Sequence, residues 1–158
     1  MSCGLAIAAV LLLANPDVAL AAAVPVVAAD APVSVASEPL FADIVSRASV
    51  LKAVVDGWSA SGTADQDGFV AGQAFAAVKA GATELAALDM QGHIVLRDRG
   101  MDGDLKCILR GISEDIPGRI AAIEAATSPQ ERAVALAELS HLLDDNVAVI
   151  TAPPAPEV

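Results

Sequence analysis

The C-terminal third of the chain carries the sequence signal that most narrows the fold. Ser128-Pro129-Gln130-Glu131 places a serine at a helix N-cap, a proline at the first helical position and a glutamate three residues after the cap, as in a capping box. The pattern predicts a helix that ends near Asn146, a residue that tolerates a left-handed C-cap. Its apolar stripe, spaced three and four residues apart, consists of Ala133, Leu136, Leu139, Leu142 and Leu143.

Another helix is predicted directly before this one. Pro117 stands where a first helical turn accepts proline, after the N-cap candidate Asp115, and Ile116, Ile120 and Ile123 mark one face. Two helices joined by so short a turn pack antiparallel. We therefore expect a C-terminal helical hairpin.

The composition favours helices in the rest of the chain as well. Hydrophobic residues make up 55% and aromatic residues only 3%, so Ala, Val, Leu and Ile must fill the interior. Apolar residues recur at helical spacing from Leu40 to Trp58, and we expect Gly57 and the polar residues after it to stop this helix. Two shorter helices are predicted over residues 69–80 and 83–88.

The middle of the chain is ambiguous. Residues 94–96 read as a strand or an irregular loop between glycines, and Asp104 is a good N-cap for a helix over 104–114. In the alternative, residues 94–96 and 105–109 pair as a β-hairpin. The predicted fold is all-α: a small bundle of four or five short helices with the C-terminal helical hairpin, and in the alternative one central β-hairpin.

The N-terminus resembles an export signal. An apolar run from Leu5 to Ala14 precedes Asn15-Pro16 and small-residue cleavage sites that end at Ala23, although no Lys or Arg precedes the run. Ten apolar residues are too few to cross a bilayer. We predict a signal peptide over 1–23, a flexible linker over 24–39, one helical domain over 40–150 and a disordered Pro-rich tail over 151–158. The mature protein would be periplasmic or secreted, without stable membrane insertion.

Charge limits the partners. The chain has 20 acidic and 9 basic residues, a net charge of −11. This sign repels nucleic-acid phosphates and anionic lipid headgroups. Another protein is the expected partner. The leading hypothesis is a protein-binding or structural module that uses an Ala-rich helical face or the hairpin from Pro117 to Asp145.

Two polar loops suggest a weaker alternative, a calcium-responsive protein. Each has the order of acids and glycine found in degenerate EF-hand-like loops, but Ala74 and Leu109 stand where the closing glutamates should be. No other cofactor is predicted. The candidate calcium ligands are Asp65, Asp67, Asp98 and Asp102.

No catalytic residues can be named from the sequence. His93, His141 and Cys107 lack the paired spacing of a zinc site. Cys107 is interpreted as a small buried residue, with a reactive thiol or an intermolecular disulfide as the alternative. Gly111 precedes Ser113 by two residues, but an acid stands where the hydrolase elbow needs its second glycine. A small hydrolase with its site at other positions is kept as a third hypothesis.

Overall fold

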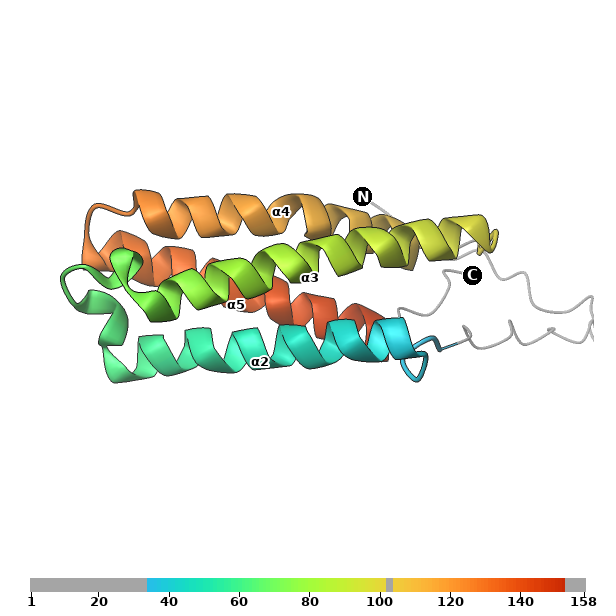
Figure 1. The fold of residues 1–158 in the computed structure, drawn as a ribbon, viewed down its shortest axis with the longest axis horizontal. Helices are drawn as coiled ribbons and strands as arrows, with labels where there is room; N and C mark the ends of the chain where they lie inside the picture. The colour runs from blue at the N-terminus through green and yellow to red at the C-terminus, as the bar shows by residue number, and fades with distance from the viewer. Residues whose placement is uncertain (1–33, 102–103, 153–158) are drawn as a thin grey trace, which may run out of the picture. The chain divides into compact units, whose positions relative to one another are not determined.

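The computed structural model describes residues 34–101 and 104–152, which form a four-helix bundle. Its helices are α2 (Pro39–Ser61), α3 (Gln73–Asp98), α4 (Leu105–Ala125) and α5 (Pro129–Thr151). Successive helices run antiparallel, each packs on the next, and α5 also packs on α2 (Figure 1). Two 3-10 turns, η1 (Thr63–Asp65) and η2 (Phe69–Ala71), connect α2 to α3. The predicted signal peptide, residues 24–33 of the linker, Asp102 and residues 153–158 lie outside the described residues.

The all-α bundle and the C-terminal helical hairpin are confirmed, whereas the alternative with a central β-hairpin is wrong. Residues 94–96 belong to α3, and residues 105–109 form the first turn of α4. The helical register buries Leu96 and Leu109 almost completely, at 1% and 0% exposure. In the described part of the chain there is no strand, and none of its helices is long and apolar enough to span a membrane.

Helix α3 is longer than predicted, because the glycines inside it allow neighbouring helices to pack closely and do not end the helix. The helices expected over 69–80 and 83–88 are largely one helix, which continues through Gly81 and Gly92. A Cβ atom at Gly81 would lie 3.2 Å from Leu51 Cδ2, and one at Gly92 would lie 3.1 Å from Leu109 Cδ1. The glycines therefore mark close approaches between helices rather than breaks.

Two other predicted helix boundaries are wrong, and a third is correct only in part. Pro117 lies inside α4 on its exposed side, so it removes one helical N–H without starting a new helix. The first helix continues past Gly57, but its end at Ser61 lies within the polar residues expected to stop it and is capped by Gly62, which has a left-handed φ of 68°. Asn146 is inside α5, and the helix continues for five more residues to Thr151.

The start of α5 agrees with the prediction. Ser128 Oγ accepts a hydrogen bond from the Glu131 backbone N–H at 3.2 Å, as an N-cap should. The Glu131 carboxylate reaches one residue further back than expected: it accepts 2.8 Å bonds from the backbone N–H and the hydroxyl of Thr127. This cap fixes the turn between α4 and α5.

An aromatic cluster closes the end of the bundle where α2 connects to α3. Trp58 and Phe69 meet edge to face with ring centroids 5.0 Å apart, and Phe75 packs against both rings. Arg132 on α5 holds this connection, since its Nη1 donates to the Ala64 carbonyl at 2.6 Å and its guanidinium lies 5.8 Å from the Phe69 centroid. Aliphatic residues from all four helices fill the remaining core.

Candidate functional site

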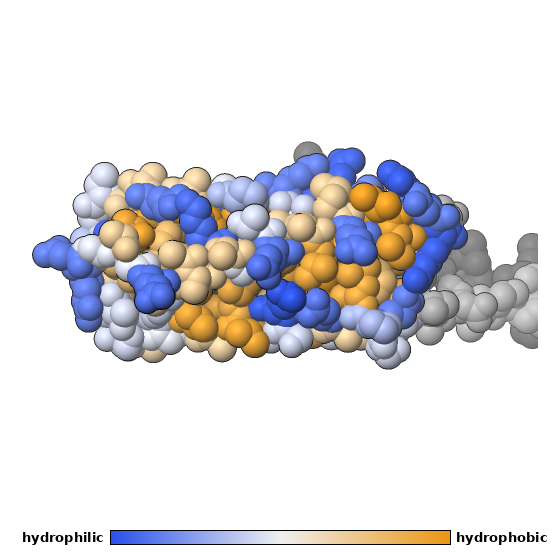
Figure 2. All heavy atoms as spheres, in the orientation of Figure 1, coloured by the Kyte–Doolittle hydropathy of each residue, from blue (hydrophilic) through white to orange (hydrophobic). Residues whose placement is uncertain are grey.

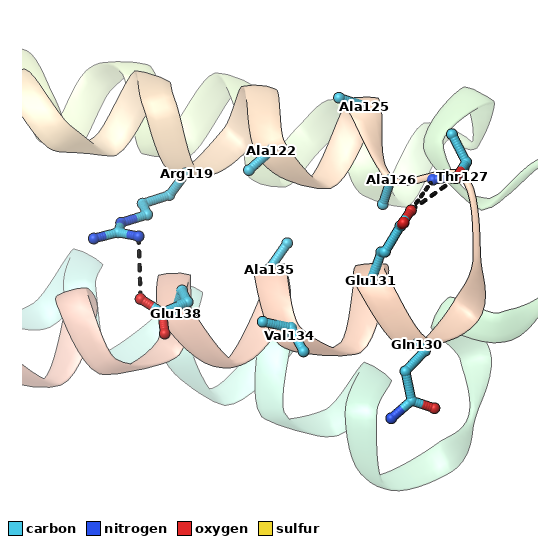
Figure 3. Close-up of a pocket in the computed structure, with 10 residues that line it drawn as sticks. All are labelled: Arg119, Ala122, Ala125, Ala126, Thr127, Gln130, Glu131, Val134, Ala135 and Glu138. Carbon is cyan, nitrogen blue, oxygen red and sulfur yellow. Dashed lines mark hydrogen bonds and ion pairs between the residues drawn. The ribbon is translucent and has the colours of Figure 1, made fainter.

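An open groove runs between α4 and α5 (Figure 3). In Figure 3, Ala122 on α4 and Ala135 on α5 point into the gap between the two helices, where short side chains leave room for another backbone to approach. Val134 beside them is 59% exposed, which is unusual for a large aliphatic residue in this bundle. The lining residues are Arg119, Ala122, Ala125, Ala126, Thr127, Gln130, Glu131, Val134, Ala135 and Glu138.

Polar contacts fix both ends of the groove. At one end Arg119 Nη1 lies 3.1 Å from Glu138 Oε2, and at the other Glu131 is bound to Thr127 (Figure 3). The hydrogen bonds from the Thr127 side chain and backbone lower the pKa of Glu131, so its charge is held in the turn. Glu131 and Glu138 are seven positions apart on α5, a distance of about 10 Å along the helix at about 1.5 Å per residue. The apolar stretch thus spans about two helical turns.

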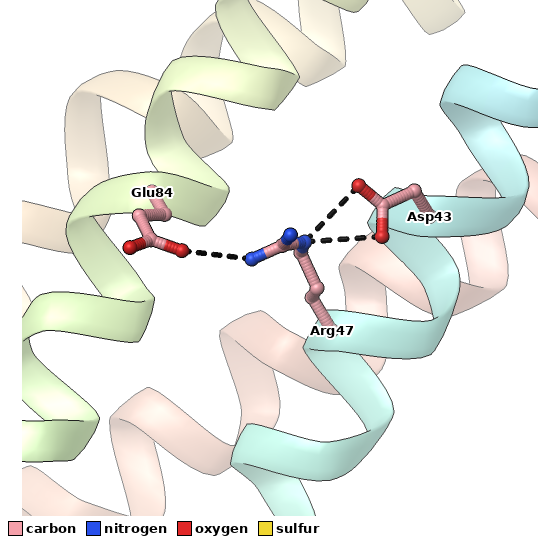
Figure 4. Close-up of polar contacts among 3 residues, drawn as sticks. All are labelled: Asp43, Arg47 and Glu84. Carbon is pink, nitrogen blue, oxygen red and sulfur yellow. Dashed lines mark hydrogen bonds and ion pairs between the residues drawn. The ribbon is translucent and has the colours of Figure 1, made fainter.

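The basic side chains are bound within the bundle, so the surplus of acids sets the charge of the surface. All 9 basic residues lie in the described ranges. Arg47 links α2 to α3, with its Nε bound to Asp43 and its Nη1 2.8 Å from Glu84 Oε2 (Figure 4). Seven bases form ion pairs with acids, and two donate to backbone carbonyls; they are Arg47, Lys52, Lys79, Arg97, Arg99, Arg110 and Arg119, and Lys106 and Arg132.

Exposed apolar residues also occur outside the groove. Val50 and Val54 on α2 are 62% and 37% exposed, and Ile94 on α3 is 39% exposed. On the face seen in Figure 2, apolar areas are broken up by hydrophilic side chains. Because Val50 is as exposed as Val134 but lies outside the groove, it is a natural control position.

Among the predicted calcium ligands that the structure describes, Asp65 and Asp67 do not lie near Asp98, and Asp102 is outside the described residues. Asp65 lies in η1 and Asp67 between η1 and η2, before the N-terminus of α3. Asp98 is the last residue of this 26-residue helix and accepts hydrogen bonds from Arg97. The helix separates the two loops by about 39 Å. Among the described residues, no cluster of three or more His, Cys, Asp or Glu side chains could hold a metal ion. Calcium binding by these loops stays a prediction.

The other candidate side chains are placed as follows. Cys107 is exposed, so its predicted burial is wrong: the helical register of α4 turns it outward while Leu109 faces the core. Ser113 Oγ donates to the Ala86 carbonyl at 2.7 Å and ties α4 to α3. His93 Nδ1 lies 2.6 Å from the Lys106 carbonyl oxygen, and His141 is exposed on α5.

Sequence reasoning missed the polar pair in the core. Asp89 on α3 and Asn146 on α5 are both 0% exposed, and Asn146 Nδ2 donates to Asp89 Oδ2 at 2.8 Å. Burial raises the pKa of Asp89 to about 7, and the hydrogen bond from Asn146 offsets part of this rise. The sequence does contain a signal for this pair: Asp89 is an isolated acid in the apolar stripe formed by Leu85, Gly92 and Leu96. The stripe can be recognised only if a single helix is assumed to continue through Gly81 and Gly92.

Comparison of the chain with protein-family models, curated proteins and solved structures finds no match.

Proposed function

We propose that the protein is a helical binding module that accepts an apolar helix of a partner protein in the groove between α4 and α5. The observation that carries this proposal is the uncharged, Ala-lined stretch with Val134 exposed at its centre and a fixed polar contact at each end. A helix laid in such a groove buries its own apolar face and reaches polar rims on both sides. About two turns of the partner fit between the fixed ends.

The charge of the bundle favours a basic partner. The whole chain has 20 acidic and 9 basic residues, and 19 acids remain after the proposed loss of the leader that contains Asp17. Since the basic side chains are already bound to acids and carbonyls of the same chain, this acidic surplus acts on molecules that approach from outside. Such a field speeds the encounter with a cationic protein and repels polyanions. The partner helix would therefore combine a face of small or apolar residues with basic residues on its flanks.

We also propose that the module acts in the periplasm or outside the cell. The apolar run and the cleavage sites before Ala23 support this location. N-terminal sequencing of the native protein should find a first residue near Val24. Recovery of the chain with Met1 attached would contradict the export proposal while leaving the groove proposal intact.

Site-specific photo-crosslinking in the producing organism tests the groove. With p-benzoylphenylalanine in place of Val134, we expect an adduct with one recurrent protein, identified by mass spectrometry. The same crosslinker at Val50, which is equally exposed on α2, should not capture this protein. Ala122→Glu, on the opposite wall of the groove, should remove the adduct. Equal capture at both positions, or no recurrent adduct at Val134, would contradict the proposal.

A further inference from the structure

The core contains one buried polar pair that the proposed function does not use. Asp89 and Asn146 are the two polar residues buried in the described part of the bundle, and both are 0% exposed. The bond between them joins α3 to α5, which are diagonal in the bundle, because α3 packs on α2 and α4 and α5 packs on the same two helices. A polar contact at this position costs stability unless all its groups are satisfied.

The pair is half satisfied as it stands. Asn146 Nδ2 donates to Asp89 Oδ2, but Asp89 Oδ1 and Asn146 Oδ1 have no hydrogen-bond partner. Both free atoms are acceptors as long as the carboxyl group is ionised. A proton on this carboxyl group supplies the missing donor, because an acid and an amide can join through two hydrogen bonds, one in each direction.

Charged groups on the surrounding helices do not compensate an ionised Asp89. In the described residues its only hydrogen-bond partner is Asn146, and burial dominates the rise of its pKa to about 7, without a contribution from another charge. The titratable groups at this level are engaged elsewhere or exposed: Asp43 and Arg47 on α2, His93 on α3, Lys106 and Arg110 on α4, and Asp144 and Asp145 on α5.

We propose that Asp89 and Asn146 form a proton-dependent latch between α3 and α5, closed while Asp89 is a neutral acid and weakened when it ionises. The ionised form leaves a buried charge without a counter-ion. Its relief is to expose the carboxylate, which requires the last turns of α5 after Asn146 to move away from α3. The latch would thus loosen the C-terminal part of α5 as the pH rises.

The sign of the pH dependence follows from linkage. The folded-state pKa of Asp89 is about 7, above the ordinary value of an aspartate, so the folded protein retains a proton that the unfolded chain releases. This stabilisation is complete below the unfolded pKa of about 4 and is lost as the pH rises through the folded value. Between these limits, one such group raises the unfolding equilibrium constant about tenfold per pH unit.

Urea unfolding of the full chain at several pH values, followed by circular dichroism, tests the latch against Asp89→Asn. The variant has nearly the same shape, carries no charge and can still form two amide hydrogen bonds with Asn146. Relative to this variant, we expect the unfolding constant of the native chain to increase about tenfold per unit between about pH 5 and 6 and to level off above about pH 7. Parallel pH profiles would overturn the proposal.

A direct titration covers the case in which Asp89→Asn does not fold. The carboxyl carbon of Asp89, followed by NMR in the native chain, should titrate near neutral pH, and the amide signals of residues 147–151 should shift in the same range. Titration near the ordinary value of an aspartate, or titration of the carboxyl without any response from α5, would overturn the latch. Neither result would bear on the groove between α4 and α5.

Discussion

Gly92 provides a sharp test of how closely the helices pack. Replacing it with alanine favours the α3 helix by about 1 kcal/mol, because alanine has the higher helix propensity. The new Cβ would lie 3.1 Å from Leu109 Cδ1, 3.3 Å from Phe41 Cε1 and 3.5 Å from Ile44 Cδ1. These three side chains are all 0% exposed and come from α2 and α4, so they have little room to move.

Overpacking of this kind costs about 1–3 kcal/mol. We therefore expect Gly92→Ala to lower the free energy of unfolding by about 1 kcal/mol once the helix-propensity gain is included. The matched control is Gly57→Ala, because Gly57 is also inside a helix but is exposed and has nothing within 4 Å of its Cβ position. This control should raise the free energy of unfolding by about 1 kcal/mol.

Urea denaturation of the two variants and the native chain gives the comparison. The two variants should differ by about 2 kcal/mol, with opposite signs relative to the native chain. If Gly92→Ala stabilises the protein as much as Gly57→Ala does, this result would contradict the conclusion that α2 and α4 approach α3 closely at Gly92.

Three further predictions each concern a single residue. Ser128→Ala removes the N-cap of α5 and should lower the unfolding free energy by about 1 kcal/mol, measured by thermal or urea unfolding; an unchanged stability would show that the cap contributes nothing. Arg132→Met removes the hydrogen bond to the Ala64 carbonyl and the contact with Phe69. It should lower the free energy of unfolding by about 2 kcal/mol and shift the tryptophan emission. An unchanged emission spectrum would argue that Arg132 does not hold the connection between α2 and α3. Iodoacetamide should modify Cys107 in the folded protein as readily as in urea, and protection in the native state would contradict its exposure.

Local signals predicted the two ends of the α4–α5 turn well. The cap at Ser128 depends on neighbours three residues away, so the sequence alone specifies it. The apolar spacing likewise predicted helical structure and the burial of Leu136, Leu139 and Leu143, although Ala133 of the same predicted stripe is exposed. For the same reason, the Ala-lined hairpin could be singled out before the groove was known.

Features set by contacts between distant residues could not be predicted in this way. Gly81 and Gly92 read as breaks in a sequence, but α3 uses them where Leu51 and Leu109 approach. Pro117 reads as a helix start, although α4 tolerates its missing N–H on an exposed side. The partnership of Asp89 and Asn146 depends on residues 57 positions apart that meet only when the bundle forms.

The position of the single tryptophan determines what fluorescence can report. Trp58 is packed between Phe69 and Phe75 at the end where α2 connects to α3, whereas α5 ends at Thr151, near the start of α2 at the opposite end. Partial fraying of that opposite end would leave the indole environment intact. Emission spectroscopy would then record a native molecule while amide exchange detected an open one, and disagreement between these two probes would reveal unfolding in separate steps.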